Sequence, residues 1–188
     1  SFFPSKNLGA FGDGGALFTR DKQISALLRS LVNHGMGERY HYEHIGVNSR
    51  LDTLQAALLR VKLTYLEEYH SARRKAAEYY DHALAGVNGL QVPVRSPFST
   101  HVFHQYTLRL SEARNKLKEH LAARQIPSMI YYPRPLHLQN AYKDLGYVKG
   151  DFPVTEKLSE QVLSLPMHTE LEEEQQAYIC EQIINFCN

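Results

Sequence analysis

The stretch that most constrains this chain is its first segment, Ser1–Leu17, in which one lysine precedes a run rich in glycine. Pro4 fixes its own backbone and favours an extended conformation at the residue before it, so the sequence predicts the end of a strand at Phe2 and Phe3. The glycines that follow allow a positive φ angle or a close approach of the backbone. Lys6 would then lie on a short, constrained turn, with its amine beside the space that these glycines leave open.

A lysine in this setting has a chemistry of its own. In a partly apolar cleft a lysine loses its proton more readily, and an unprotonated amine is what a Schiff base with a carbonyl cofactor requires. The residues alone leave a second interpretation open, in which Lys6 is a surface lysine beside a solvated loop.

The wider sequence string favours the first interpretation. Ser-Phe-Phe-Pro-Ser-Lys-Asn at residues 1–7, continued by Gly-Asp-Gly-Gly-Ala at residues 12–16, resembles the cofactor-lysine segment of the DegT/DnrJ/EryC1/StrS family of sugar aminotransferases. The resemblance implies that Lys6 is the catalytic residue and binds the cofactor, pyridoxal 5'-phosphate. It also implies an α/β fold, namely the C-terminal part of a fold-type-I aminotransferase. We therefore expect residues 1–60 to be the end of the large cofactor-binding domain, and residues 61–188 to be a bridging helix and a small α/β domain.

A second motif ends the polar segment 34–50, whose length is typical of a functional loop. The motif resembles the second signature of the family, and its members here are Gly46, Asn48, Arg50, Leu51, Asp52, Gln55, Ala56 and Ala57. The resemblance places Asn48 at the cofactor phosphate of the neighbouring subunit, in a homodimer with shared active sites. It places Arg50 nearby, where a guanidinium suits a substrate anion. From the residues alone, an ion pair between Arg50 and a nearby acid stays open.

The same polar segment holds three histidines and two glutamates. Their spacing matches no metal-binding motif on a helix, so we interpret them as solvated loop residues and predict no metal site.

A third group of candidate residues lies in the segment 131–139, Tyr-Tyr-Pro-Arg-Pro-Leu-His-Leu-Gln, which resembles another family segment. On this resemblance we expect Tyr131, Tyr132 and His137 to contact the substrate. Segments 150–156 and 165–168 also match the family, although Thr169 stands where the family has proline. For His137 and His168 a structural role, bonded to backbone groups, stays open.

Periodicity and capping residues predict the remaining secondary structure. We expect strands at residues 16–19, 101–110 and 128–132. We expect helices from Asp21 to Gly35, from Asp52 to about Ala85, after Ser111, near Thr155, and after a capping box at Thr169 and Glu172. The charged segment 67–75 predicts a solvated face in the middle of the second helix.

Composition narrows the possible partners. A net charge of +1 predicts no strong field for nucleic acid or membranes, and two cysteines are too few for a disulfide framework. The chain has no signal peptide and no apolar run of membrane-spanning length, which fits a cytoplasmic protein. Because it opens at the predicted end of a strand and lacks an initiator methionine, we expect it to be the C-terminal part of a longer protein.

The branch of the family that this chain resembles aminates UDP-linked 3-keto sugar acids during synthesis of bacterial surface polysaccharides such as lipopolysaccharide O-antigen. We therefore expect a nucleotide-sugar substrate and glutamate as the amino donor. A dTDP-keto-sugar aminotransferase is one alternative, and a catalytically incomplete fragment that serves only in dimerisation is another. A sugar-dehydrating branch has histidine in place of Lys6 and is disfavoured.

Overall fold

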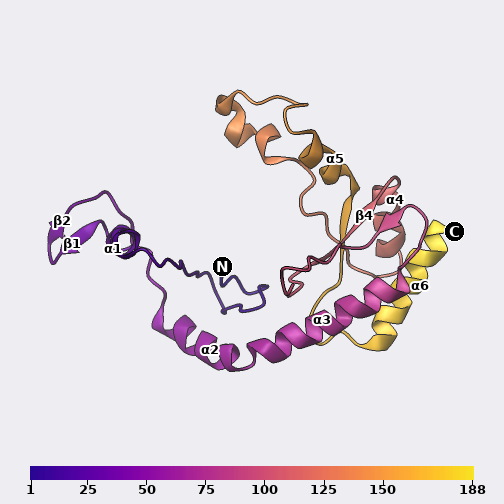
Figure 1. Ribbon diagram of the computed structural model, residues 1–188, viewed down its shortest axis with the longest axis horizontal. Coiled ribbons are helices and arrows are strands. Elements are labelled where there is room, and N and C mark those ends of the chain that lie inside the picture. Colours follow the sequence, from indigo (N-terminus) through magenta and orange to yellow (C-terminus); the bar gives the residue numbers. More distant parts are fainter. The chain divides into compact units, whose positions relative to one another are not determined.

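The computed structural model describes all 188 residues, which form two compact units (Figure 1). We call Ser1–Glu67 the N-terminal unit and Glu68–Asn188 the C-terminal unit. The expected boundary between residues 60 and 61 concerns the domains of the larger fold and stays a prediction. None of the helices is both long and apolar enough to cross a membrane.

The N-terminal unit contains helix α1 (Lys22–Leu31), which begins as its sequence predicts. The Asp21 carboxylate accepts hydrogen bonds from the backbone amides of Gln23 and Ile24, at 2.7 and 3.0 Å. These amides have no partner inside the helix, so the carboxylate satisfies donors that would otherwise need water.

The rest of this unit departs from the sequence prediction in two places. The polar segment after α1 contains a small antiparallel hairpin, β1 (Met36–Glu38) with β2 (His41–Tyr42). The expected strands at residues 2–3 and 16–19 are absent, and Leu17 and Phe18 are 71% and 92% exposed. A strand forms only against a partner, and no segment of the unit pairs with either stretch.

The long helix predicted from Asp52 to about Ala85 is two helices, α2 (Thr53–Thr64) and α3 (Leu66–Ala83). Tyr65 leaves the helical conformation, with φ −103° and ψ 4°, and its amide bonds to the carbonyl of Lys62 in a tighter turn. Helix α3 ends at Ala83, slightly before the predicted end, and Gly86 follows in a turn with a φ angle of +74°.

A three-stranded antiparallel sheet organises the C-terminal unit, in the order β3 (Leu90–Gln91), β4 (Tyr106–Leu110) and β5 (Val162–Leu165). Tyr106 pairs with Leu165 and Arg109 with Val162, so β4 is bonded along most of its length. Helices α4 (Arg114–Ala122), α5 (Pro153–Gln161) and α6 (Glu173–Cys187) complete the unit, with two short 3-10 helices, η1 (Leu136–Leu138) and η2 (Asn140–Leu145).

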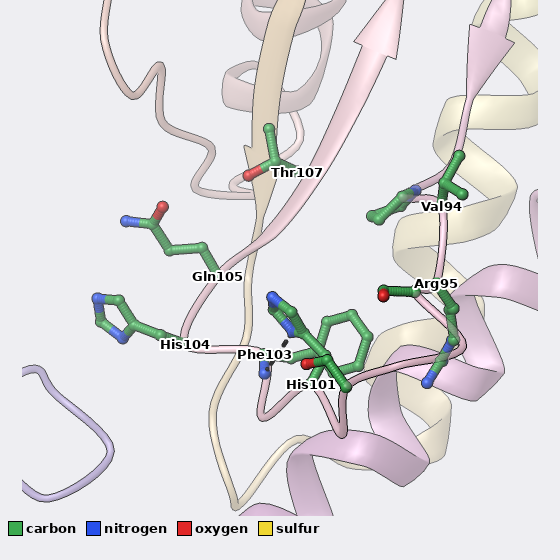
Figure 2. Close-up of a pocket in the computed structure, with 10 residues that line it drawn as sticks. Val94, Arg95, His101, Phe103, His104, Gln105 and Thr107 are labelled. Carbon is green, nitrogen blue, oxygen red and sulfur yellow. Dashed lines mark hydrogen bonds between the residues drawn. The ribbon is translucent and has the colours of Figure 1, made fainter.

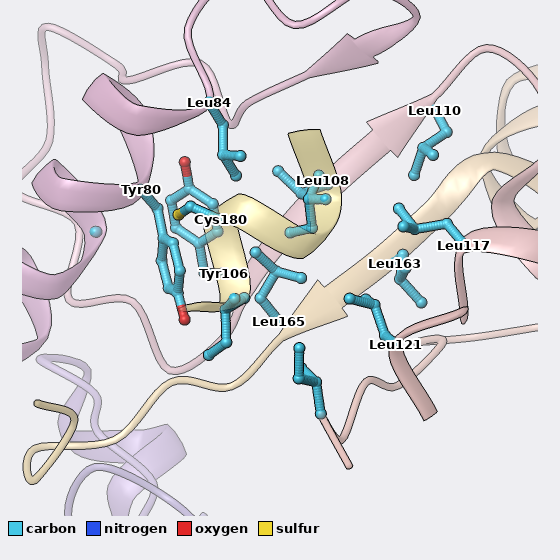
Figure 3. Packing of buried hydrophobic residues seen from close by; sticks show 14 of the residues in the cluster. Tyr80, Leu84, Tyr106, Leu108, Leu110, Leu117, Leu121, Leu163, Leu165 and Cys180 are labelled. Atoms are coloured by element: carbon cyan, nitrogen blue, oxygen red, sulfur yellow. The ribbon is translucent and has the colours of Figure 1, made fainter. Parts of the chain in front are cut away.

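The core of this unit lies between the sheet and helices α3, α4 and α6 (Figure 3). Alternate residues of β4 point into it, namely Tyr106, Leu108 and Leu110. The helices contribute fully buried side chains such as Tyr80, Leu117 and Ile183. Each buried leucine or isoleucine stabilises the fold by about 1.5–3 kcal/mol.

Three expected features of this unit are wrong. Residues 128–132 form no strand and make only an isolated bridge, between Met129 and Ser164 of β5. Helix α4 begins after Ala113, so Ser111 does not cap it. The capping box of α6 is formed by Glu172 and Gln175, because the helix begins three residues later than Thr169 would allow.

Candidate active site

Lys6 lies on a tight turn that closes on itself through backbone hydrogen bonds. Its amide donates to the carbonyl of Phe3 at 2.9 Å, and the amide of Ala10 donates to the carbonyl of Phe2 at 2.7 Å. A side chain at Gly9 would place its Cβ 2.3 Å from the Pro4 carbonyl oxygen, so the turn admits only glycine there. The Lys6 side chain is half-buried on this turn. No hydrogen bond or ion pair engages its amine.

Helix α2 holds the glycine-rich run that follows Lys6. The Lys62 amine donates to the carbonyl of Gly9 at 2.6 Å and lies 5.6 Å from the centre of the Phe11 ring. The Gln55 carbonyl oxygen accepts from the amide of Phe11 at 2.8 Å. Sequence reasoning gave Gln55 no role and missed Lys62. The available signal was their spacing of seven, which puts both on one face of a helix.

Asn48 and Arg50 are brought together by a direct hydrogen bond, from Arg50 Nε to Asn48 Oδ1 at 2.9 Å. Backbone bonds hold segment 47–49 against the end of α1 and the residues after it: Val47 N to Leu31 O, Ser49 N to Val32 O, and His34 N to Val47 O. Gly46 permits this contact, because a Cβ there would lie 2.2 Å from the amide nitrogen of Gly35. The partner of Arg50 is therefore an amide and not an acid, against the ion pair that the residues left open.

The donors of this pair suit an anion. With its oxygen accepting from Arg50, the Asn48 amide presents N–H groups, and the terminal N–H groups of Arg50 are also donors. Both side chains thus have donors that phosphate or carboxylate can accept, and the binding roles that the resemblance gives them stay predictions. Together with the uncommitted Lys6 amine, they fit a phosphorylated carbonyl cofactor.

The third group of candidates belongs to the C-terminal unit. The rings of Tyr131 and Tyr132 lie edge to face with centroids 5.6 Å apart, and both side chains are exposed. His137 instead is buried, with Nε2 2.9 Å from Glu156 Oε1 and its ring 4.8 Å from that of Phe152. The partner of His137 is thus a carboxylate. The roles expected for these three residues in substrate binding stay predictions.

The Glu156 side chain stabilises the turn that precedes α5 through hydrogen bonds. Its carboxylate accepts from the amide of Gly150 at 2.8 Å, from His137, and from the amide of Phe152 at 3.4 Å. The Gly150 bond is the largest cause that lowers the pKa of this carboxyl group, and partial desolvation opposes it. Sequence reasoning did not single out Glu156, because its partners lie in a turn whose course only the fold reveals.

We expect the turn around Gly150 to loosen in acid. A carboxyl group with a lowered pKa stabilises the fold above its unfolded pKa of about 4.3, and this contribution is lost as the pH falls through the folded pKa. Protection of the amides of Gly150 and Phe152 against hydrogen exchange, relative to the intrinsic exchange rate at each pH, should therefore fall below about pH 4 in the natural protein. In Glu156→Gln this pH dependence should disappear, whereas Glu160→Gln, an exposed change on the same helix, should retain it. An unchanged profile in Glu156→Gln would contradict the assignment.

The expectation of a solvated charged face at residues 67–75 is wrong at Arg73. This side chain is buried, and its Nη1 donates to the carbonyls of Phe103, His104 and Met167 at 3.1–3.2 Å. Burial lowers the pKa of the guanidinium. Arg73 therefore joins α3 to the segment before β4 and to the segment after β5.

A hollow of about 380 Å³ lies in the C-terminal unit between segments 93–99 and 101–107 (Figure 2). Arg95 lines it, and its guanidinium stacks 4.6 Å from the centre of the Phe103 ring. Arg95 also forms an ion pair with Asp81, in which Nε and Nη2 both donate to Oδ2, at 2.8 and 2.5 Å, and the other carboxylate oxygen accepts from the Tyr106 hydroxyl at 2.6 Å. The positive charge in the hollow is thus already neutralised. None of the predicted site residues lines it.

Comparison with known proteins decides the family. Residues 1–184 match the model of the DegT/DnrJ/EryC1/StrS aminotransferase family. The chain belongs to this family. The prediction made from the Lys6 segment and the Asn48–Arg50 motif is therefore confirmed at the level of the family.

Several curated relatives carry names of sugar-nucleotide aminotransferases. A UDP-N-acetyl-3-dehydro-alpha-D-glucosamine 3-aminotransferase of Acidithiobacillus ferrooxidans is 47% identical over 183 residues, which are 97% of this chain and 48% of that protein. A UDP-2-acetamido-2-deoxy-3-oxo-D-glucuronate aminotransferase of Pseudomonas aeruginosa is 43% identical over 98% of this chain and 50% of that protein. A dTDP-3-amino-3,4,6-trideoxy-alpha-D-glucose transaminase of Streptomyces venezuelae is 42% identical over 97% and 48%.

The fold is shared with a solved structure of S. venezuelae DesV, described as a complex with a ketimine intermediate. The match has a TM-score of 0.94 at 40% identity and covers all of this chain and 50% of that one. The expected fold class, part of a fold-type-I aminotransferase, is confirmed. The chain spans about half the length of the curated relatives that it matches.

Proposed function

We propose that this chain works within a pyridoxal phosphate-dependent aminotransferase that places an amino group on a keto sugar linked to a nucleotide. The observation that carries this proposal is a lysine with an uncommitted amine, held on a fixed turn, in a chain that matches the family over residues 1–184. Pyridoxal phosphate, when bound, supplies the electron sink for transamination. The residues of the chain supply binding, orientation and proton transfer.

We assign the roles as follows. Lys6 would hold the cofactor and, when released from it, would take the proton from the α-carbon of the amino donor; in the second half of the reaction it would return a proton to the sugar carbon that receives the amino group. Asn48 donates to the cofactor phosphate of the partner in a homodimer, and Arg50 binds an anion of the substrate. Tyr131 and Tyr132 offer hydroxyl groups to the substrate from an exposed segment. The bond between His137 and Glu156 supports an indirect role for His137, in which it holds that segment in place.

The names of the relatives support a more specific proposal for the sugar acceptor. Two of the three named above carry names of enzymes for UDP-linked sugars oxidised at carbon 3, and one for a dTDP-linked sugar. We therefore propose a UDP-linked 3-keto sugar as acceptor, glutamate as donor, and a place in bacterial surface polysaccharide synthesis. A dTDP-linked keto sugar is the second candidate.

The test uses the full-length protein with pyridoxal phosphate and glutamate labelled with nitrogen-15. We expect the label to appear on a UDP-linked 3-keto sugar, with kcat/KM at least about tenfold higher than for the dTDP-linked analogue, a ratio that a hydrogen bond to the ribose 2'-hydroxyl, which dTDP lacks, can supply. Transfer to the dTDP sugar alone would select the second candidate. No transfer from any amino acid to either sugar would contradict the proposed activity.

A further inference from the structure

We propose that Lys62 and Gln55, on one face of α2, are positioning residues for Lys6. This inference rests on the proposed function and deepens it. Lys6 makes no bond from its own amine, so its place depends on the turn that carries it. The far side of that turn, Gly9–Phe11, is held from outside by the two α2 side chains, at 2.6 and 2.8 Å.

The two bonds fix consecutive parts of the backbone just after Lys6. Lys62 binds a carbonyl at Gly9, a buried residue that no other amino acid could replace without a clash. Gln55 binds the amide of Phe11, two residues further on. The bonds that Lys6 shares with Phe3 close the turn locally but do not attach it to the rest of the unit. The bonds from Lys62 and Gln55 attach it to α2.

Helix α2 also follows directly from the anion-binding motif. Asp52 stands at its N-cap position, two residues after Arg50. Helices are stiff over a few turns, so one rigid element begins three residues after Arg50 and bonds the turn of Lys6. Both predicted binding groups are therefore attached to the same short helix.

Loss of the Lys62 bond should free the turn. A charged amine bonded to a part-buried carbonyl is a stronger contact than a neutral pair, and its removal leaves the Gly9 carbonyl without its donor. Lys6 would then visit more conformations, and a smaller fraction of them would place its amine where it can bond the carbonyl of a fixed cofactor. The Schiff base should weaken even though Lys6 itself is intact.

Two measurements on the full-length protein test this inference. In Lys62→Met, hydrogen exchange of segment 7–12 without cofactor should be about tenfold faster than in the natural protein. Absorbance titration with pyridoxal phosphate should show an apparent affinity about tenfold weaker. Lys62→Arg, which keeps a charged donor, should restore both. Arg60→Met removes the same charge from an exposed site on α2 and should change neither.

The outcomes separate this inference from the proposed function. Unchanged exchange in Lys62→Met would overturn the inference. Faster exchange with unchanged cofactor affinity would overturn it too, because the contact would then be purely structural. If the natural protein bound no pyridoxal phosphate, the proposed function would fail, and with it the positioning role, whatever the exchange data showed.

Discussion

Replacing Lys6 with alanine is expected to lower kcat of the full-length protein at least about 1,000-fold, because one change removes both the cofactor bond and the proton carrier. The turn around Lys6 is closed by backbone groups, so the truncated side chain leaves its geometry in place. Steady-state transamination rates give the effect on kcat. A thermal unfolding curve close to that of the natural protein would show that the loss is chemical.

Lys22→Ala is the matched control, since Lys22 is an exposed lysine in the same unit and begins α1. We expect it to retain its full rate. Added methylamine, which can replace a missing amine as a base, should raise the rate of Lys6→Ala and leave the control unchanged. A Lys6→Ala protein that retained more than about a tenth of kcat would show that this lysine is not the proton carrier.

Replacing Arg73 with methionine is expected to destabilise the C-terminal unit by about 3 kcal/mol. The change leaves three carbonyls without their donor, those of Phe103, His104 and Met167. The change also removes the desolvation cost of burying a guanidinium, whose partners here include no carboxylate. This gain offsets part of the stability that is lost with the three hydrogen bonds. Urea unfolding followed by circular dichroism should show a midpoint lowered by about 1–2 M.

Lys75→Met is the control for this change, because Lys75 is exposed two residues further along α3. We expect its midpoint to stay within about 0.3 M of the natural value, as for most surface changes. Equal midpoints for Arg73→Met and Lys75→Met would mean that the three carbonyl bonds add nothing to stability.

The parts of the fold that depend on neighbouring residues could be predicted from the sequence. Asp21 caps α1 because its carboxylate reaches amides two and three residues away. Gly86 suits the turn after α3 because its own φ angle is positive. The motif at Lys6 pointed to the family through its resemblance to the cofactor-lysine segment, and local crowding explains why Gly9 in that segment is a glycine.

The parts of the fold that depend on residues far apart in the sequence could not be predicted from it. Nothing in the run 128–132 indicates that it makes only one bridge, to Ser164, or that the strand beside β4 is formed by residues 162–165. The polarity of Arg73 predicts exposure, whereas the carbonyls that it binds lie 30 and more residues away. Lys62 binds Gly9 across 53 residues, so its role emerges only when α2 is placed against the turn of Lys6.

The central claim is that Lys6 forms the bond to the cofactor, and borohydride reduction tests it most directly. The full-length protein is mixed with pyridoxal phosphate, reduced, digested, and mapped by mass spectrometry. The account predicts one tagged peptide, with the cofactor mass on Lys6. A tag spread over exposed lysines such as Lys22 and Lys75, with Lys6 unmodified, would contradict it.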